Sequence, residues 1–132
     1  MLVPQSSPLL RVCQLLNEAE AMYLICGAQT CILHGLVRTT EAVDILVEAT
    51  EENCARVIKG LSKLAVEVDV STHARKVTYT DAVATSQTTV VQGVRIPFLS
   101  LDSLILSKET YREQDAFDRL RLLELKRRAH GS

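Results

Sequence analysis

Tryptophan is absent from this chain of 132 residues, and aromatic side chains of all kinds make up only 4% of it. A core without large rings has to be filled by aliphatic side chains, and hydrophobic residues do make up 47% of the sequence. The charges nearly cancel, since 15 Lys and Arg stand against 16 Asp and Glu. This balance excludes a strongly basic nucleic-acid coat and a long acidic tail. A mean hydropathy of +0.12 with a charged fraction of 23% excludes an intrinsically disordered chain.

Long apolar runs are also missing, because no run approaches the roughly 20 residues that cross a bilayer. Residues 1–8 lack the basic flank and apolar stretch of a signal peptide. We therefore expect a cytoplasmic protein without a membrane partner. Its four cysteines, Cys13, Cys26, Cys31 and Cys54, are then expected to be reduced thiols. The length favours a single domain over residues 1–132.

Hydrophobic spacing predicts helices and strands in alternation along most of the chain. We expect helices at 8–19, 29–34, 51–64, 101–105 and 113–128, with Ser7, Thr50 and Ser100 as N-terminal caps. Strands are expected at 22–26, 42–47, 66–70, 76–79, 88–91 and 94–96, and Pro97 is expected to end the last strand. The apolar stripes of the third and last helices are predicted as Val57, Ile58, Leu61 and Leu64, and as Phe117, Leu120, Leu123 and Leu125. This order indicates one α/β or α+β domain.

Two blocks of the sequence carry a distinctive order of residues. The first, residues 25–48, reads ICGAQTCILHGLVRTTEAVDILVE: a strand, a Gly, a short helix, His-Gly, Arg-x-Thr, and a strand with an inward acid. The second, residues 93–120, has a strand that enters through a Pro and a Leu-rich helix with Lys108, followed by Arg112, Asp115 and Asp118. Together the blocks resemble the minimal nucleotidyltransferases of the DNA polymerase β superfamily. The resemblance is greatest to the small stand-alone proteins of abortive-infection and toxin–antitoxin modules.

The resemblance implies a nucleotidyltransferase-like fold, with a short mixed β-sheet flanked by helices and a helical C-terminal end. It also implies a site in which a small pair at a strand-to-helix turn takes up triphosphate oxygens. An Asp-x-Asp motif on the next strand presents two carboxylates on one face to hold two Mg²⁺ ions. On this chain the implied nucleotide-binding residues are Gly27, Ala28, Arg38 and Lys108. The implied catalytic and metal-binding residue is Asp44.

The metal motif departs from the family pattern, because Ala42-Val43-Asp44 stands where Asp-x-Asp is expected. A methyl group thus occupies the place of the first acid. The third acid is expected on the strand at 76–79, where Thr78 is the best-matching position. Asp81 replaces it if the register shifts, and Asp69 on the preceding strand is another candidate. A site in which only one carboxylate matches the family pattern is expected to bind Mg²⁺ weakly.

Several other signals have a structural interpretation. His34-Gly35 predicts a helix end closed by a left-handed Gly, rather than a catalytic His. Cys26, Cys31 and His34 do not complete four zinc ligands at a known spacing, so buried thiols are expected. The basic run 126–128 predicts a solvated helix end, and no aromatic residues interleave it for base stacking. A nucleic-acid partner is therefore not expected.

Three functions follow. The preferred interpretation is a degenerate nucleotidyltransferase-fold protein, catalytically impaired, that binds an NTP weakly at most. It would act on a partner protein as a regulatory or antitoxin-like subunit. The second is an active enzyme that moves a nucleoside monophosphate from an NTP to a protein or RNA hydroxyl, with Asp44 and a displaced acid such as Asp81 holding Mg²⁺. The third is a non-enzymatic domain that forms a homodimer through the apolar faces of its terminal helices.

Overall fold

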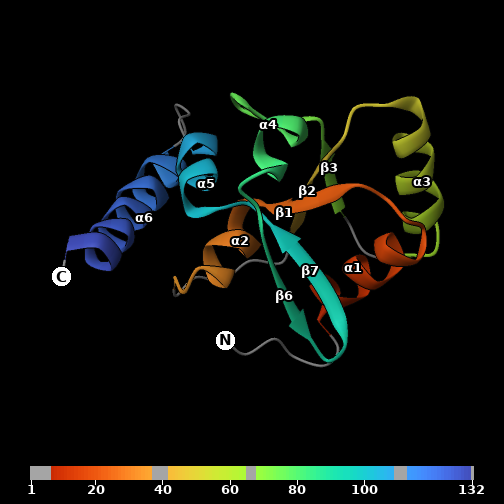
Figure 1. The fold of residues 1–132 in the computed structure, drawn as a ribbon, viewed down its shortest axis with the longest axis horizontal. Coiled ribbons are helices and arrows are strands. Elements are labelled where there is room, and N and C mark those ends of the chain that lie inside the picture. Colours follow the sequence, from red (N-terminus) through yellow and green to blue (C-terminus); the bar gives the residue numbers. More distant parts are fainter. Residues whose placement is uncertain (1–6, 37–41, 65–67, 109–112, 132) are drawn as a thin grey trace.

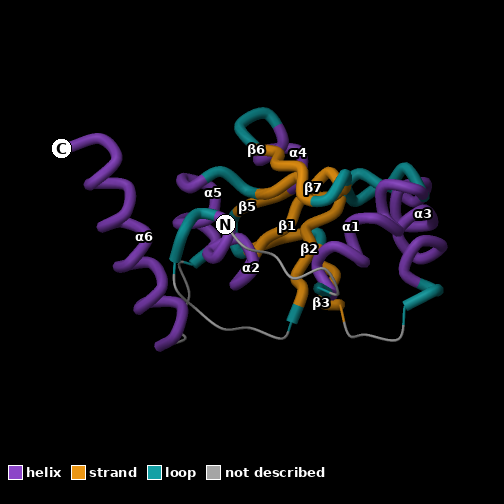
Figure 2. Tube along the Cα trace, turned by 90° about the horizontal axis from the view of Figure 1, so that it is seen from below, coloured by secondary structure: helices purple, strands orange, loops and turns teal. Residues whose placement is uncertain are grey.

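The structure is a computed structural model that describes residues 7–36, 42–64, 68–108 and 113–131. It is a mixed α/β fold, in which a five-stranded sheet of order β3-β2-β1-β7-β6 lies between helices (Figures 1 and 2). The strands of this sheet are β1 (Tyr23–Cys26), β2 (Val43–Val47), β3 (Val68–Ser71), β6 (Gln87–Val91) and β7 (Val94–Phe98). A small second sheet pairs β4 (His73–Ala74) with β5 (Val77–Thr78). The expectation of a mixed α/β fold, with a mixed sheet flanked by helices and a helical C-terminal end, is confirmed.

The helices are α1 (Pro8–Glu18), α2 (Gly27–Leu33), α3 (Glu51–Leu61), α4 (Tyr79–Val83), α5 (Leu101–Ser107) and α6 (Glu113–Gly131). All three predicted caps are confirmed. The hydroxyl oxygens of Ser7, Thr50 and Ser100 accept hydrogen bonds from backbone N–H groups in the first turns of α1, α3 and α5. None of the helices in the described ranges has both the length and the apolar character needed to cross a membrane.

The two faces of the sheet bury different sets of side chains, because alternate residues of a strand point to opposite sides. One face carries Ile25 and Ile45 and packs against α1 and α3. The other face carries Leu24 and Leu46 and packs with residues of α5 and with Leu122 of α6. Figure 1 shows α1 and α3 on the right of the sheet and α5 and α6 on the left. Asp44, between Val43 and Ile45 on β2, therefore points to the α5 side.

Some element predictions are wrong. The helix at 51 ends at Leu61 rather than at 64, and Ile58 of its predicted stripe is 69% exposed, while Val57 is buried. The segment at 76–79 is a two-residue strand followed by α4, because the Thr78 hydroxyl caps that helix by accepting from the Asp81 backbone N–H at 3.3 Å. Pro97 lies inside β7. Pro97 is the register partner of Thr88 on β6. It has no register partner on β1, where the pair is Ile25 with Phe98, so no pairing with β1 requires the N–H that Pro97 lacks.

The predicted stripe of α6 is also wrong. Phe117, Leu120 and Leu123 are exposed, and the side of α6 that faces the protein carries Leu122 with Asp115 and Asp118. The reason is that these two acids follow α5 closely enough to meet Lys108 at its end, which turns a partly polar face of α6 inward.

Candidate functional site

The end of β1 brings together two of the candidate acids. Cys26, the last residue of β1, is the register partner of Asp44 on β2, and Asp44 is the register partner of Asp69 on β3. The three side chains therefore form a row on one face of the sheet, with about 4.8 Å between adjacent strands. Asp44 is half-buried and Asp69 is exposed, so solvent reaches the row.

Gly27 lies directly against this row. Its φ of +67° is in the left-handed region, which closes the turn from β1 into α2. A Cβ atom added at this position would overlap Oδ2 of Asp44 and lie 2.9 Å from its Cγ. The backbone thus approaches the Asp44 carboxyl group as closely as only a glycine allows.

Lys108 and its two acids form a buried ion cluster beside the row. The Lys108 Nζ lies 3.3 Å from Oδ1 of Asp115 and 3.2 Å from Oδ2 of Asp118, and all three side chains are at least nine-tenths buried. The cluster joins the end of α5 to the first turns of α6. Three of the four residues taken from the second sequence block therefore do meet in space. Arg112, the fourth, lies outside the described residues.

The charged groups that act on Cys26 include members of both the ion cluster and the row of Cys26, Asp44 and Asp69. Burial, and then the negative charge of Asp44, raise the pKa of the Cys26 thiol to about 12. The positive charge of Lys108 acts in the opposite direction, and Asp69 adds a smaller upward effect. Cys26, Asp44, Asp69 and Lys108 thus share one electrostatic environment on the α5 side of the sheet.

Asp81 lies elsewhere. It is exposed in the first turn of α4. Tyr79 and Val83 of that helix line a small pocket with Met22 and Leu24, at the beginning of β1. Asp44 is in register with Cys26, at the opposite end of this four-residue strand. The structure therefore brings Asp69 beside Asp44 and places the helix of Asp81 away from it.

The structure says less about the roles of two further candidates, Ala28 and Arg38. Ala28 is buried in the first turn of α2, directly after Gly27, where its small side chain fits the packed interior. Arg38 belongs to residues 37–41, which lie outside the described part of the chain.

The expected helix end at His34-Gly35 and the expected burial of Cys26 and Cys31 are confirmed. His34 follows α2. Its Nε2 lies 2.8 Å from the Leu99 carbonyl oxygen, and its ring makes a T-shaped contact with the Phe98 ring. Gly35 follows it with a φ of +102°. All four cysteines are free thiols, and burial raises the pKa of Cys13 to about 11. Within the described ranges, no group of three or more His, Cys, Asp or Glu side chains could hold a metal ion.

Sequence reasoning gave Asp69 less weight than Asp81, whereas the strand register places Asp69 beside Asp44, and it did not single out Asn53. The signal for Asp69 is an acid between two apolar residues, Val68 and Val70, as Asp44 stands between Val43 and Ile45. Asn53 has no such signal. It is buried at the start of α3, accepts from Met22 N–H at 2.6 Å, and donates to the carbonyls of Met22 and Glu48. It anchors α3 to the ends of β1 and β2.

No family model, curated protein or solved structure matches the chain. The chemistry of the site is therefore argued from its geometry. Asp44 and Asp69 offer carboxylate oxygens, which Mg²⁺ prefers, at an edge that solvent reaches. Ala42, which shares the Asp44 face two residues earlier, is exposed and offers none.

Proposed function

We propose that the chain is a nucleotidyltransferase-like subunit with an incomplete cation site, which binds Mg²⁺-nucleotide weakly at most and acts through a partner protein. A regulatory or antitoxin-like role is the form of this proposal that the sequence resemblance favours. The observation that carries it is the row at the end of β1. Asp44 and Asp69 are in register, Gly27 lies against Asp44, and the remaining acid position is Ala42.

The donor set explains why the proposal is weak binding rather than catalysis. Two Mg²⁺ ions require several carboxylate oxygens in octahedral geometry in addition to the substrate phosphates. Among the described residues, this edge of the sheet offers Asp44 and Asp69 only, so the set does not fit two ions. Loss of one preorganised charge-stabilising group costs on the order of 10²–10³ in rate. Lys108 does not replace it, since two carboxylates already hold its ammonium group.

Calorimetric titration with Mg²⁺-ATP tests the proposal. We expect little or no heat from the wild type and measurably tighter binding by Ala42→Asp, because the new carboxylate joins Asp44 and Asp69 on one face. Ala55→Asp is the matched control, since it adds the same charge at an exposed position of α3, on the other side of the sheet. It should leave binding unchanged.

The same titration distinguishes the two candidate third acids. In the Ala42→Asp background, Asp69→Asn should abolish the gain and Asp81→Asn should leave it intact. The reverse order would show that Asp81 completes the site. Efficient Mg²⁺-dependent transfer from a labelled NTP by the wild type, lost in Asp44→Ala, would overturn the proposal.

The active nucleotidyltransferase is the second candidate. The register of Asp44 with Asp69 favours it, because two acids lie side by side where the sequence motif supplied only Asp44. The homodimeric interaction domain has less support from the terminal helices. The apolar face of α1 is buried within the protein, so of these two terminal helices α6 is the one whose described residues include exposed large apolar side chains.

A further inference from the structure

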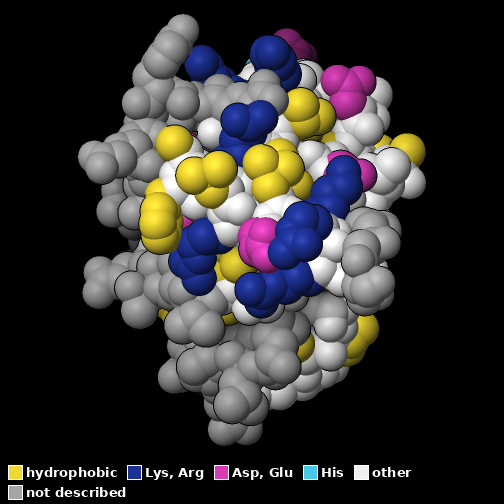
Figure 3. Space-filling model, turned by 90° about the vertical axis from the view of Figure 1, so that its left-hand side faces the viewer, with side chains coloured by type: hydrophobic (Ala, Val, Ile, Leu, Met, Phe, Trp, Pro, Cys, Tyr) yellow, Lys and Arg dark blue, Asp and Glu magenta, His cyan; other side chains and the backbone are white. Residues whose placement is uncertain are grey.

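One face of α6 is apolar and yet open to solvent. Phe117 is 57% exposed and Leu120 is 67% exposed, whereas Leu122, on the inner side of the same helix, is fully buried. Large apolar side chains that gather on a surface within a polar rim mark contact sites for other molecules. Figure 3, which faces this side of the protein, shows the hydrophobic side chains grouped together and bordered by Lys and Arg.

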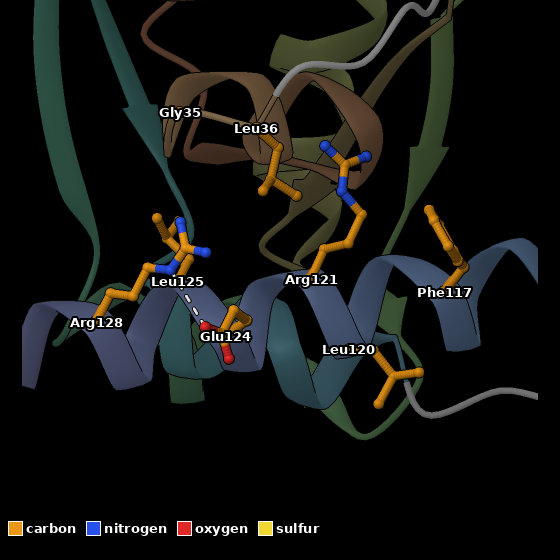
Figure 4. A pocket seen from close by; sticks show the side chains of 8 residues that line it. All are labelled: Gly35, Leu36, Phe117, Leu120, Arg121, Glu124, Leu125 and Arg128. Carbon is orange, nitrogen blue, oxygen red and sulfur yellow. Dashed lines mark hydrogen bonds and ion pairs between the residues drawn. The ribbon is translucent and has the colours of Figure 1, made fainter. Parts of the chain in front are cut away.

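These side chains line a groove, which we call the α6 groove. Its volume is about 450 Å³. Gly35 and Leu36 form one wall, and the other wall is one stripe of α6, made of Phe117, Leu120, Arg121, Glu124, Leu125 and Arg128 (Figure 4). The stripe spans eleven steps of helix, which is about 17 Å at 1.5 Å per residue. That length matches about three turns of a second helix laid along it.

The rim of the α6 groove is positive. Arg121 and Arg128 line it, and the Arg121 guanidinium carbon lies 5.8 Å from the centre of the Phe117 ring. The one acid in the lining, Glu124, is bound by Arg127 at 2.5 Å and by Arg128 at 3.1 Å. These hydrogen bonds, that of Arg127 first, lower the Glu124 pKa to about 2, so its charge persists and is balanced within α6. A ligand with an apolar stripe and acidic flanks would complement both the walls and the rim.

We propose that the α6 groove binds an acidic amphipathic helix of a partner protein. A second copy of this chain fits poorly, because like positive rims would face each other. Nucleic acid would match the positive rim but would leave the side chains of Leu36, Leu120 and Leu125 without an apolar partner, and a membrane would not match a concave site. The proposal rests on the proposed function only in that both give the chain a protein partner.

Fluorescence anisotropy tests this with a labelled designed peptide of about 18 residues, long enough to form a helix in water. The peptide carries Leu at helical spacing and Glu on both flanks, and a matched peptide carries Lys in place of every Glu. We expect saturable binding of the Glu peptide, weakened by added salt, and none of the Lys peptide. Leu120→Asp should weaken binding at least about tenfold, as loss of a central contact does.

Val90→Asp is the matched control, because Val90 on β6 is 64% exposed and lies outside the groove. It should bind the Glu peptide like the wild type. The double variant Arg121→Glu with Arg128→Glu should reverse the preference towards the Lys peptide. The proposal is overturned if Leu120→Asp and Val90→Asp bind alike, or if the wild type does not distinguish the peptides. It is equally overturned if single-stranded RNA, phosphatidylserine vesicles or a second copy, seen by sedimentation, binds in place of the Glu peptide.

The two proposals fail separately. The Mg²⁺-ATP titration changes no residue of α6, and the peptide assay contains neither nucleotide nor Mg²⁺. Loss of peptide binding with intact effects of Ala42→Asp would refute the α6 groove alone, and the converse would refute the cation site alone.

Discussion

Gly27→Ala is the most direct test of how the site is built. The structure has Gly27 at a φ of +67°, with its Cα facing the Asp44 carboxyl group. An added methyl group would overlap Oδ2 and lie 2.9 Å from Cγ and 3.0 Å from Cβ of Asp44. The substitution therefore combines backbone strain with a collision against one identified side chain.

The two effects have different sizes and can be separated. A left-handed conformation costs an L-residue about 1–2 kcal/mol. Forcing an extra methyl group into a packed position typically costs about 1–3 kcal/mol more. We therefore expect Gly27→Ala to lower the free energy of unfolding by about 2–5 kcal/mol.

Urea denaturation followed by circular dichroism measures this loss. Gly93→Ala is the matched control, because Gly93 has a similar φ of +79° with no atom within 4 Å of an added Cβ. It should show the strain alone, about 1–2 kcal/mol. In the double variant Gly27→Ala with Asp44→Ala, the colliding carboxyl group is gone, so the loss relative to Asp44→Ala should fall towards the Gly93→Ala value.

The reasoning is refuted if Gly27→Ala costs no more than Gly93→Ala. It is also refuted if Asp44→Ala gives no relief, since the two substitutions would then be additive and the residues would not be in contact.

Three further predictions concern stability. Asn53→Ala should cost about 1–3 kcal/mol in urea denaturation, because it leaves buried backbone groups without their partner. Lys108→Met should cost about 3–5 kcal/mol, because two buried carboxylates lose their shared ammonium group, and restoration of stability at acidic pH would support this cause. Above pH 9, stability should fall by up to about 1.4 kcal/mol per pH unit for each buried thiol of Cys13 and Cys26, until their raised folded-state pKa values of about 11 and 12 are reached. The sign follows because the unfolded thiols release protons near pH 9 while the folded ones retain them, and a flat stability profile from pH 9 to 11 would contradict it.

Local sequence signals predicted the elements that depend on local interactions. Ser7, Thr50 and Ser100 were recognisable as caps because a short hydroxyl side chain before an apolar period can bond only the exposed N–H groups of a first turn. The buried strands β1 and β2 were recognisable from apolar runs that end at a Gly or a polar residue. The prediction errors occur where one residue is compatible with two local structures. Thr78 fits a strand and caps α4, and Pro97 fits both the end of a strand and a position inside β7 that has a register partner on β6 and none on β1.

In the candidate site, too, some residues could be identified from the sequence and others could not. The resemblance of two sequence blocks to the nucleotidyltransferases implied Gly27 and Asp44 as site residues and placed Ala42 where the first acid is expected, because these three positions lie in adjoining segments of one block. The partner of Asp44 did not follow from spacing, since α3 lies between β2 and β3 and permits several registers. Packing on both sides of the sheet selected the register that aligns Asp44 with Asp69.

The sequence by itself thus determined most of the helices and strands, although not α4 or β4, and that β1 ends at a glycine, since these depend on interactions within a few residues. Only the tertiary structure decided which distant residues meet. The strand register placed Asp69, and not Asp81, beside Asp44. The tertiary structure also turned Leu122 inward and Phe117 and Leu120 outward on α6, because the pairing of Lys108 with Asp115 and Asp118 sets the rotation of that helix. A helical spacing of apolar residues indicates that a helix buries one face, but the residues that the helix packs against in the fold decide which face is buried.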